Sequence, residues 1–176
     1  MISEIAKAEK YDFAFSELYE RYSRNLFLFC KHYAQSKDDL HNAYQEAWTS
    51  LFENIRAGKE IKTTIAFLIT VAKRRIYYSL RKSKKKPEIV KLNENMILKI
   101  DEEFDSEASQ IIYEAINKLD EKYKEALVLH RIAGLKGDEL VEITGVSDEC
   151  IRKRSQRALG KLKLIILELN KDNGNE

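Results

Sequence analysis

Glycine and proline are scarce in this sequence, and this scarcity constrains the fold more than any other feature. The chain has 6 glycines and 1 proline among 176 residues, which is about 4% against a usual value of about 12%. Hairpins and tight turns of β-sheet proteins depend on these two residues, so an all-β sandwich or barrel is disfavoured. A hydrophobic share of 44% is enough to build a core. We therefore expect an all-α protein.

Basic and acidic residues are segregated along the chain, although the net charge is only +2. Residues 73–86 and residues 152–163 are rich in lysine and arginine and contain no acidic residue, whereas residues 94–107 are predominantly acidic. Each basic stretch could neutralise several phosphates, and the acidic stretch would be repelled by them. The charge pattern is thus compatible with two nucleic-acid-binding segments separated by an acidic one.

Apolar side chains recur at three- and four-residue steps in two blocks, which is the pattern of amphipathic helices. We expect a first helical domain over residues 8–87, a linker over residues 88–105 and a second helical domain over residues 106–170. The linker is predicted because its residues are acidic, lack a sustained period and follow Pro87, which stops the preceding helix. The fold class is therefore two small helical domains joined by an acidic linker.

Several local features follow from the same reading. We expect Gly58 to end a helix in the left-handed conformation that glycine tolerates. Thr64 and Asp120 are predicted N-caps, because their side-chain oxygens can accept hydrogen bonds from the first free N–H groups of a helix. One continuous helix is expected through residues 123–132, and Trp48 is expected in the core.

Residues 135–162 have the parts of a helix-turn-helix: a short helix, a glycine turn and a longer capped helix. Gly145 suits the turn and Ser147 suits the N-cap. On the longer helix, three- and four-residue steps predict one inward face, formed by Ile151, Ser155, Ala158, Leu162, Ile165 and Leu169.

The opposite face of that helix carries candidate DNA-binding residues. They are Arg152, Lys153, Gln156 and Arg157, with Ser147 at the start of the helix. Arginine and glutamine can read guanine and adenine edges in a major groove, and lysine supplies charge for phosphates. The alternative is a solvated basic face on an ordinary amphipathic helix. Asp148 and Glu149 count against DNA, because they would repel nearby phosphates, although they favour the helix dipole.

These motifs resemble a known family. The runs LDEKYKEALVL over residues 119–129, ELVEITGVS over residues 139–147 and IRKR over residues 151–154 resemble region 4 of bacterial sigma factors, most closely the extracytoplasmic-function group of the sigma-70 family. In the first block, QEAW over residues 45–48 resembles the family's region 2.2 helix, and residues 67–82 resemble the helix of region 2.4.

The resemblance implies roles for residues in the first block. Region 2.2 grips the clamp coiled coil of core RNA polymerase, which implies polymerase contacts by Asn42, Gln45, Glu46 and Glu53; Asn42 stands where an acidic residue is usual. Region 2.4 faces the −10 element, which implies −10 contacts by Lys73, Arg74, Tyr77, Tyr78 and Arg81. Aromatic faces in a cationic groove suit unpaired bases. The alternative for Tyr77 is core packing.

The sequence shows no pattern typical of a metal-binding protein or an enzyme. His32, His41 and His130 have no partners at metal-ligand spacing, and no catalytic set or phosphate-cradling loop is present, so we expect no metal, no cofactor and no enzyme. Cys30 and Cys150 form no disulfide framework, which favours a reducing compartment. With no signal-peptide pattern and no membrane-spanning run, we expect a cytoplasmic protein without membrane insertion.

We therefore expect a sigma factor that directs core RNA polymerase to promoter DNA and starts transcription. The first domain would recognise and melt the −10 element, and the second would recognise the −35 element. The family also implies a regulatory anti-sigma factor as a partner. Two alternatives remain: a helix-turn-helix regulator acting without core polymerase, and a helical protein-interaction adaptor that never binds DNA.

Overall fold

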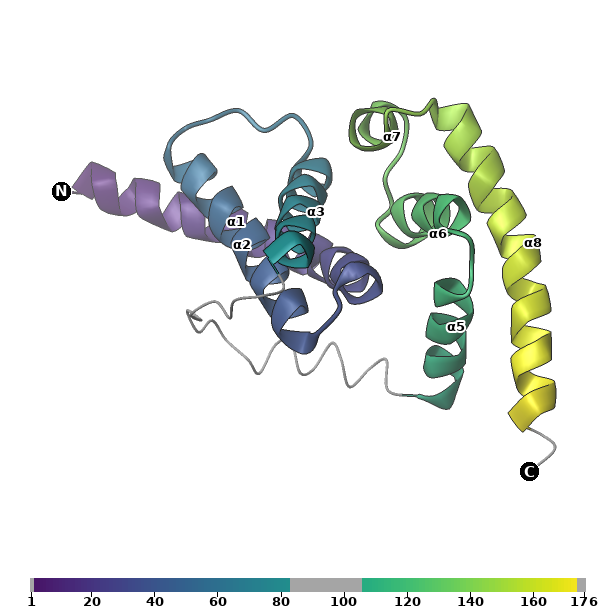
Figure 1. Ribbon diagram of the computed structural model, residues 1–176. Helices are drawn as coiled ribbons and strands as arrows, with labels where there is room; N and C mark the ends of the chain where they lie inside the picture. Colours follow the sequence, from purple (N-terminus) through teal and green to yellow (C-terminus); the bar gives the residue numbers. More distant parts are fainter. Residues whose placement is uncertain (1, 83–105, 174–176) are drawn as a thin grey trace. The chain divides into compact units, whose positions relative to one another are not determined.

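The computed structural model describes residues 2–82 and 106–173, and every regular element in these ranges is a helix (Figure 1). The chain divides into two compact units, Met1–Leu92 and Asn93–Glu176, each of which is described here by itself. The predicted all-α, two-domain fold class is thus confirmed. The predicted linker, residues 88–105, lies outside the described residues, and the predicted domain boundaries stay predictions.

The first unit is a bundle of three helices, α1 (Ile2–Tyr33), α2 (Lys37–Arg56) and α3 (Thr64–Lys82), each of which packs against the other two. Helix α1 begins earlier than residue 8, where we expected the first domain to begin. Residues 2–10 lack a clear apolar stripe in the sequence, but they are rich in alanine, glutamate and lysine, which have a high intrinsic helix propensity.

The ends of α2 follow from its sequence. Ser36 has an extended backbone, and its Oγ accepts a hydrogen bond from the Asp39 N–H at 3.1 Å. Two acidic residues in the first turn favour the positive end of the helix dipole. At the other end, Gly58 has a φ of +68°, as predicted for a residue that ends a helix in the left-handed region.

The predicted N-cap of α3 is wrong by one residue. Helix α3 begins at Thr64, and the Phe67 N–H donates to the Thr63 carbonyl oxygen at 3.1 Å, which places Thr63 at the cap position. Two adjacent threonines offer the same capping chemistry, so the sequence alone does not distinguish them. Burial of Leu68 and Ile69 in the bundle sets the helix register.

An aromatic cluster joins α1 to α2 in the core of the first unit. The ring of Trp48 lies 4.7 Å from that of Tyr19 and 5.7 Å from that of Phe15, between ring centroids. The Tyr44 and Tyr19 hydroxyls share a hydrogen bond of 2.9 Å, and burial, before other causes, raises the pKa of Tyr44. Trp48 is only 5% exposed, so its predicted place in the core is confirmed.

The second unit is organised around one long helix, α8 (Asp148–Asn173). Helices α5 (Glu107–Asn117), α6 (Glu121–Leu127) and α7 (Asp138–Thr144), together with the π-helix η1 (Val128–Ile132), all pack against it (Figure 1). The predicted inward face of α8 is confirmed. It consists of buried Ile151, Ser155, Ala158 and Leu169 and half-buried Leu162 and Ile165.

Two expectations about α6 are corrected. The helix predicted through residues 123–132 ends at Leu127 and continues as the π-helix η1, in which the Ala133 N–H reaches the Val128 carbonyl oxygen at 2.7 Å. This wider turn forms where η1 packs against α8, and π-helical turns occur often at functional sites. Asp120 holds the N-cap position of α6, but its side chain makes no capping hydrogen bond. Its carboxylate instead pairs with Lys161 Nζ of α8 at 3.8 Å.

Candidate nucleic-acid interface

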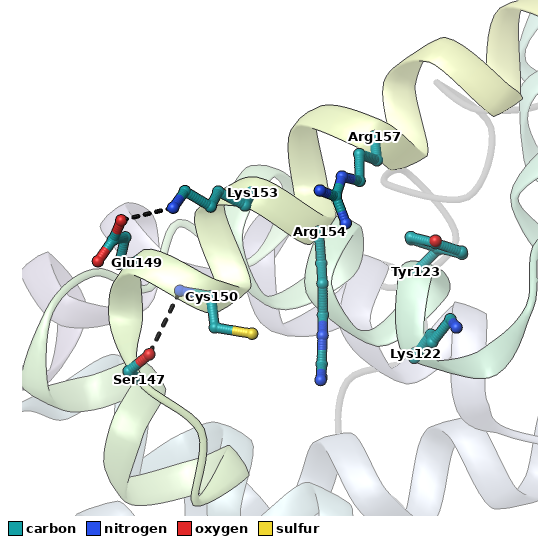
Figure 2. A pocket seen from close by; sticks show the side chains of 8 residues that line it. All are labelled: Lys122, Tyr123, Ser147, Glu149, Cys150, Lys153, Arg154 and Arg157. Carbon is teal, nitrogen blue, oxygen red and sulfur yellow. Dashed lines mark hydrogen bonds and ion pairs between the residues drawn. The ribbon is translucent and has the colours of Figure 1, made fainter.

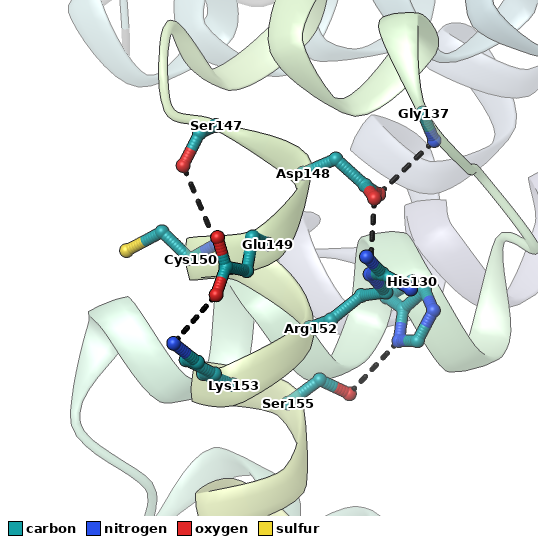
Figure 3. Close-up of polar contacts among 9 residues, drawn as sticks. All are labelled: His130, Gly137, Ser147, Asp148, Glu149, Cys150, Arg152, Lys153 and Ser155. Carbon is teal, nitrogen blue, oxygen red and sulfur yellow. Dashed lines mark hydrogen bonds and ion pairs between the residues drawn. The ribbon is translucent and has the colours of Figure 1, made fainter.

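Helices α7 and α8 meet at a tight, hydrogen-bonded turn. Gly145 has a φ of +68°, which is the left-handed conformation that glycine adopts without steric cost. The Thr144 hydroxyl donates to the Leu140 carbonyl oxygen at 2.6 Å and accepts from the Val146 N–H at 3.1 Å. Ser147 Oγ accepts from the Cys150 N–H at 3.4 Å (Figure 3). The predicted turn at Gly145 and the N-cap at Ser147 are confirmed, and a helix-turn-helix results.

The turn leaves one side of α8 open to solvent. Four side chains on that side are exposed, namely Arg152, Lys153, Gln156 and Arg157, which together form the outer face of α8. They lie opposite the buried Ile151, Ser155 and Ala158 of the same helix. The structure therefore brings together the four side chains on which the sequence prediction of DNA binding rests, in positions that a duplex could reach.

Two acidic residues in the first turn of α8 pair with cations of the outer face (Figure 3). Arg152 Nε lies 3.0 Å from Asp148 Oδ2, and Lys153 Nζ lies 2.6 Å from Glu149 Oε1. Asp148 Oδ1 also accepts a hydrogen bond from the Gly137 N–H at 3.1 Å, which ties the start of α7 to α8. The two acids would repel a nearby phosphate, but they also hold Arg152 and Lys153 in place. Arg157, by contrast, has no ion-pair partner among the residues that the structure describes.

A cavity of about 440 Å³ lies on one side of the outer face, between α6 and α8 (Figure 2). Lys122 and Tyr123 of α6 line it opposite Arg154 and Arg157 of α8. The side chains of Lys122, Arg154 and Arg157 give the cavity a positive lining, which favours an anionic occupant such as a DNA phosphate. Sequence reasoning did not assign Lys122 or Tyr123 to a site. Their role depends on the packing of α6 beside α8, which no local pattern reveals.

A second cavity, of about 480 Å³, lies on the other side of the outer face. His130 and Arg131 of η1 line it together with residues of α8, among them Arg152 and Gln156. His130 Nδ1 lies 3.3 Å from Ser155 Oγ. Burial, followed by the charge of Arg131, lowers the pKa of His130, with further lowering by Arg152 and Lys136 and an opposing effect of Asp148. His130 is therefore mainly neutral near pH 7.

The first unit carries a second candidate surface on α3. Arg74, Tyr77, Tyr78 and Arg81 are exposed and recur at three- and four-residue steps, and they form the outer face of α3; Lys73 beside them is half-buried. Tyr77 and Tyr78 are each 46% exposed, so the alternative that Tyr77 packs in the core is wrong. The guanidinium carbon of Arg75 lies 5.8 Å from the centroid of the Tyr78 ring.

The residues predicted to contact polymerase lie on α2. Glu53 is exposed, whereas Asn42, Gln45 and Glu46 are half-buried. Glu46 Oε2 lies 3.5 Å from Arg75 Nε of α3, and Ser79 of α3 donates a hydrogen bond to Asp39 of α2. Part of the predicted polymerase surface therefore also holds α2 and α3 together, which the sequence alone did not reveal.

None of the helices over residues 2–82 and 106–173 is long and apolar enough to cross a bilayer. In the same residues, no cluster of three or more histidine, cysteine, aspartate or glutamate side chains is arranged to hold a metal ion.

The family model for sigma-70 region 2 matches residues 18–86, and the model for sigma-70 region 4 matches residues 109–162. Together these matches cover more than half of the chain, in the order of the two units. The chain belongs to the sigma-70 family. The predicted resemblance, including the extracytoplasmic-function group, is thereby confirmed.

Individual relatives agree with this assignment. The chain is 36% identical over 90 residues to the RNA polymerase sigma factor SigZ of Bacillus subtilis (strain 168), a match that covers 51% of this chain and 49% of that protein. The chain thus spans about half the length of the curated relative it matches.

Two solved structures share the fold. The sigma factor RpoE, in complex with the anti-sigma factor NepR from Bartonella quintana, matches with a TM-score of 0.61 and 18% identity, over 87% of this chain and 96% of that one. CnrH, in complex with the cytosolic domain of CnrY, matches with a TM-score of 0.58 and 17% identity, over 88% of both chains.

Proposed function

We propose that this chain is a sigma factor that directs core RNA polymerase to promoter DNA and starts transcription, without a catalytic activity or a cofactor of its own. The observation that carries the proposal is the outer face of α8, where Arg152, Gln156 and Arg157 stand exposed on a helix-turn-helix that matches sigma-70 region 4. Function in transcription would place the protein in the cytoplasm.

The second unit would recognise the −35 element. In a helix-turn-helix the second helix enters the major groove, and its N-terminal residues meet base edges. Arg152, Lys153, Gln156 and Arg157 occupy that part of α8, and Ser147 is the N-cap that precedes it. Arginine and glutamine have bidentate geometry for guanine and adenine. The cavity lined by Lys122 and Arg154 would lie along the phosphate backbone beside the groove.

The first unit would recognise and melt the −10 element. Unpaired bases stack on aromatic faces, and cations follow the backbone that carries them. Tyr77 and Tyr78 offer exposed rings on the outer face of α3, and Lys73, Arg74 and Arg81 supply charge beside them. The outer face of α3 would therefore supply the side chains that strand separation needs.

Two kinds of protein partner follow from the family. Core RNA polymerase would contact α2 through Asn42, Gln45, Glu46 and Glu53, and would fix the separation of the two DNA-binding units. Two weak contacts joined in one complex give a much higher effective affinity than either alone. Because both solved structures above are complexes, one of them with an anti-sigma factor, we also propose a regulatory anti-sigma partner for this chain.

The test is transcription by a reconstituted enzyme. Core RNA polymerase is mixed with the purified chain on linear promoter DNA, and run-off transcripts are measured. Initiation that requires both components is the expected result. Binding of duplex DNA without polymerase would favour the helix-turn-helix regulator, and neither activity would favour the protein-interaction adaptor.

A further inference from the structure

The two cavities that flank the outer face of α8 differ in the charged side chains that line them. Lys122 of α6 and Arg154 of α8 line the first cavity, and lysine and arginine stay cationic across the physiological pH range. In the second cavity, η1 contributes His130 beside Arg131. Histidine is the side chain whose charge ordinarily changes between about pH 5 and about pH 8. The second cavity therefore gains a positive charge when the pH falls.

Both cavities lie where the strands of a bound duplex would pass. Lys153 and Arg157 line both cavities, so they form the ridge between them. A helix with its side chains is about 10–12 Å wide and a major groove is about 12 Å wide, so a recognition helix fills the groove and its two flanks face the two strands. With the ridge in the groove, each cavity would face the phosphates of a different strand.

His130 is held in the second cavity by a contact with the buried side of α8 (Figure 3). Its Nδ1 atom lies 3.3 Å from Oγ of Ser155, which is fully buried. Contact through Nδ1 leaves Nε2, on the other side of the ring, for a group that enters the cavity. The imidazole is thus oriented before any DNA arrives.

The charges around His130 oppose its protonation when no DNA is bound. Burial, followed by the charge of Arg131, lowers the pKa of His130, whereas Asp148 acts in the opposite direction. Arg152 and Lys136 lower the pKa further. The other charged residues that line the same cavity are Glu149, Lys153 and Arg157. Helix α6, all of which the structure describes, packs against η1 but contributes no residue to the lining of this cavity.

A phosphate in the second cavity would change this balance. A negative charge close to an imidazole favours the protonated form, so the pKa of His130 would be higher in the DNA complex than in the free chain. A group whose pKa rises on binding takes up a proton when the complex forms, and the complex is then stabilised by acid.

We propose that the second unit takes up a proton at His130 when it binds duplex DNA, so that promoter recognition strengthens as the pH falls. The proposal rests on the sigma-factor role proposed above, since it adds a pH response to the same interface. Affinity is lowest above the pKa of the DNA-bound state, rises as the pH falls through it and levels off below the pKa of the free state. The competing role is a neutral histidine that only packs η1 against α8.

The experiment measures binding of the reconstituted enzyme to a fluorescently labelled promoter by anisotropy, at several pH values and one salt concentration. With the natural chain, we expect the affinity to rise about five- to tenfold from about pH 8 to about pH 6, within the limit of about tenfold per pH unit that one proton allows. His130→Gln, which stays neutral, should match the natural chain near pH 8 and lack this rise.

His130→Lys places a permanent charge in the cavity. It should bind tightly at both ends of the pH range. It should also steepen the dependence of log affinity on log salt by about 0.9 relative to His130→Gln, because one more phosphate is neutralised. A histidine that acts through packing alone would not produce this difference in salt dependence.

His41→Gln is the matched control, because it makes the same change at a half-buried histidine of α2 in the first unit. It should keep the full pH response. Effects of pH on core polymerase are common to all variants, so the difference between His130→Gln and the natural chain isolates His130. Circular dichroism at both ends of the pH range shows whether each variant is folded.

The outcomes separate this proposal from the sigma-factor role. If His130→Gln and the natural chain respond equally to pH, the proposal is overturned while the sigma-factor role stands; a loss of affinity by the same factor at every pH would then assign His130 to packing. If the natural chain gives no polymerase-dependent promoter binding at any pH, the proposed function fails, and the proton uptake fails with it.

Discussion

The outer face of α3 and the outer face of α8 are both basic, but different side chains accompany the cations. On α3, two exposed tyrosines stand among the arginines, and each is 46% exposed. On α8, the cations stand with Gln156 and with two acids, which pair with them at 3.0 Å and 2.6 Å. Positive charge is thus combined with aromatic rings in one unit and with hydrogen-bonding groups in the other.

This difference distinguishes two ways of binding DNA. An aromatic ring can stack on any unpaired base, and stacking requires little control over the direction of the side chain. Base edges in a duplex are read by hydrogen bonds, which require side chains held in a defined direction. The Asp148 contacts with Gly137 and Arg152 supply such restraint on α8. We therefore expect α3 to act on separated strands and α8 to act on the intact duplex.

The largest expected effect tests whether the two units are stable independently. Trp48→Ala removes the centre of the aromatic cluster, and large-to-small changes of this kind cost about 3–5 kcal/mol. Hydrogen exchange followed by mass spectrometry should show faster exchange in α3 and unchanged exchange in α8.

Leu140→Ala is the reciprocal variant, because Leu140 is fully buried in the second unit. It should cost about 2–5 kcal/mol and accelerate exchange in α8 while leaving exchange in the first unit unchanged. Should either substitution accelerate exchange equally in both units, the description of the chain as two separate units would be wrong.

The next effect concerns duplex reading by α8. Arg157 is exposed and has no ion-pair partner among the described residues, so it is available to a guanine edge. Arg157→Ala should cost about 1–3 kcal/mol at one −35 position. Transcription from promoters with single −35 substitutions measures this loss. Lys171→Ala, near the end of the same helix, should have no such effect. A loss of equal size on every promoter would indicate a phosphate contact only.

A smaller effect concerns strand separation by α3. Tyr77→Ala should reduce open-complex formation by about 1–2 kcal/mol, because one stacked ring is lost. A template whose −10 region is already mismatched should restore part of the activity, whereas it should not rescue Arg157→Ala. Phe13→Ala, which removes another exposed ring of the first unit, is the control. If the mismatched template rescues both Tyr77→Ala and Arg157→Ala, or neither of them, the proposed division between α3 and α8 is wrong.

Much of this fold could be predicted because its signals are local. Helical steps in the sequence predicted the buried face of α8, and the properties of Gly145 and Ser147 predicted the turn before it. The same steps place Arg74, Tyr77, Tyr78 and Arg81 together on α3, although they do not say whether Tyr77 faces the core.

The features that sequence reasoning missed depend on residues far apart in the chain. Lys122 and Tyr123 reach the cavity beside Arg157 only because α6 packs on α8. The π-helix η1 brings His130 to Ser155, and no periodicity predicts a wider turn of this kind. The contact between Glu46 and Arg75 likewise joins α2 to α3. Each is a product of tertiary packing.

This contact between α2 and α3 gives the smallest expected effect. Glu46→Gln breaks a partly exposed ion pair of 3.5 Å, and such pairs contribute about 0.2–1 kcal/mol to stability. Urea denaturation should register a loss of that size. If Glu46 also contacts polymerase, the variant should bind core enzyme more weakly than its small loss of stability explains. Glu60→Gln, an exposed change of the same charge beyond α2, should bind normally. Equal binding by both variants would assign Glu46 to holding α2 against α3, and would leave Asn42, Gln45 and Glu53 as the polymerase surface.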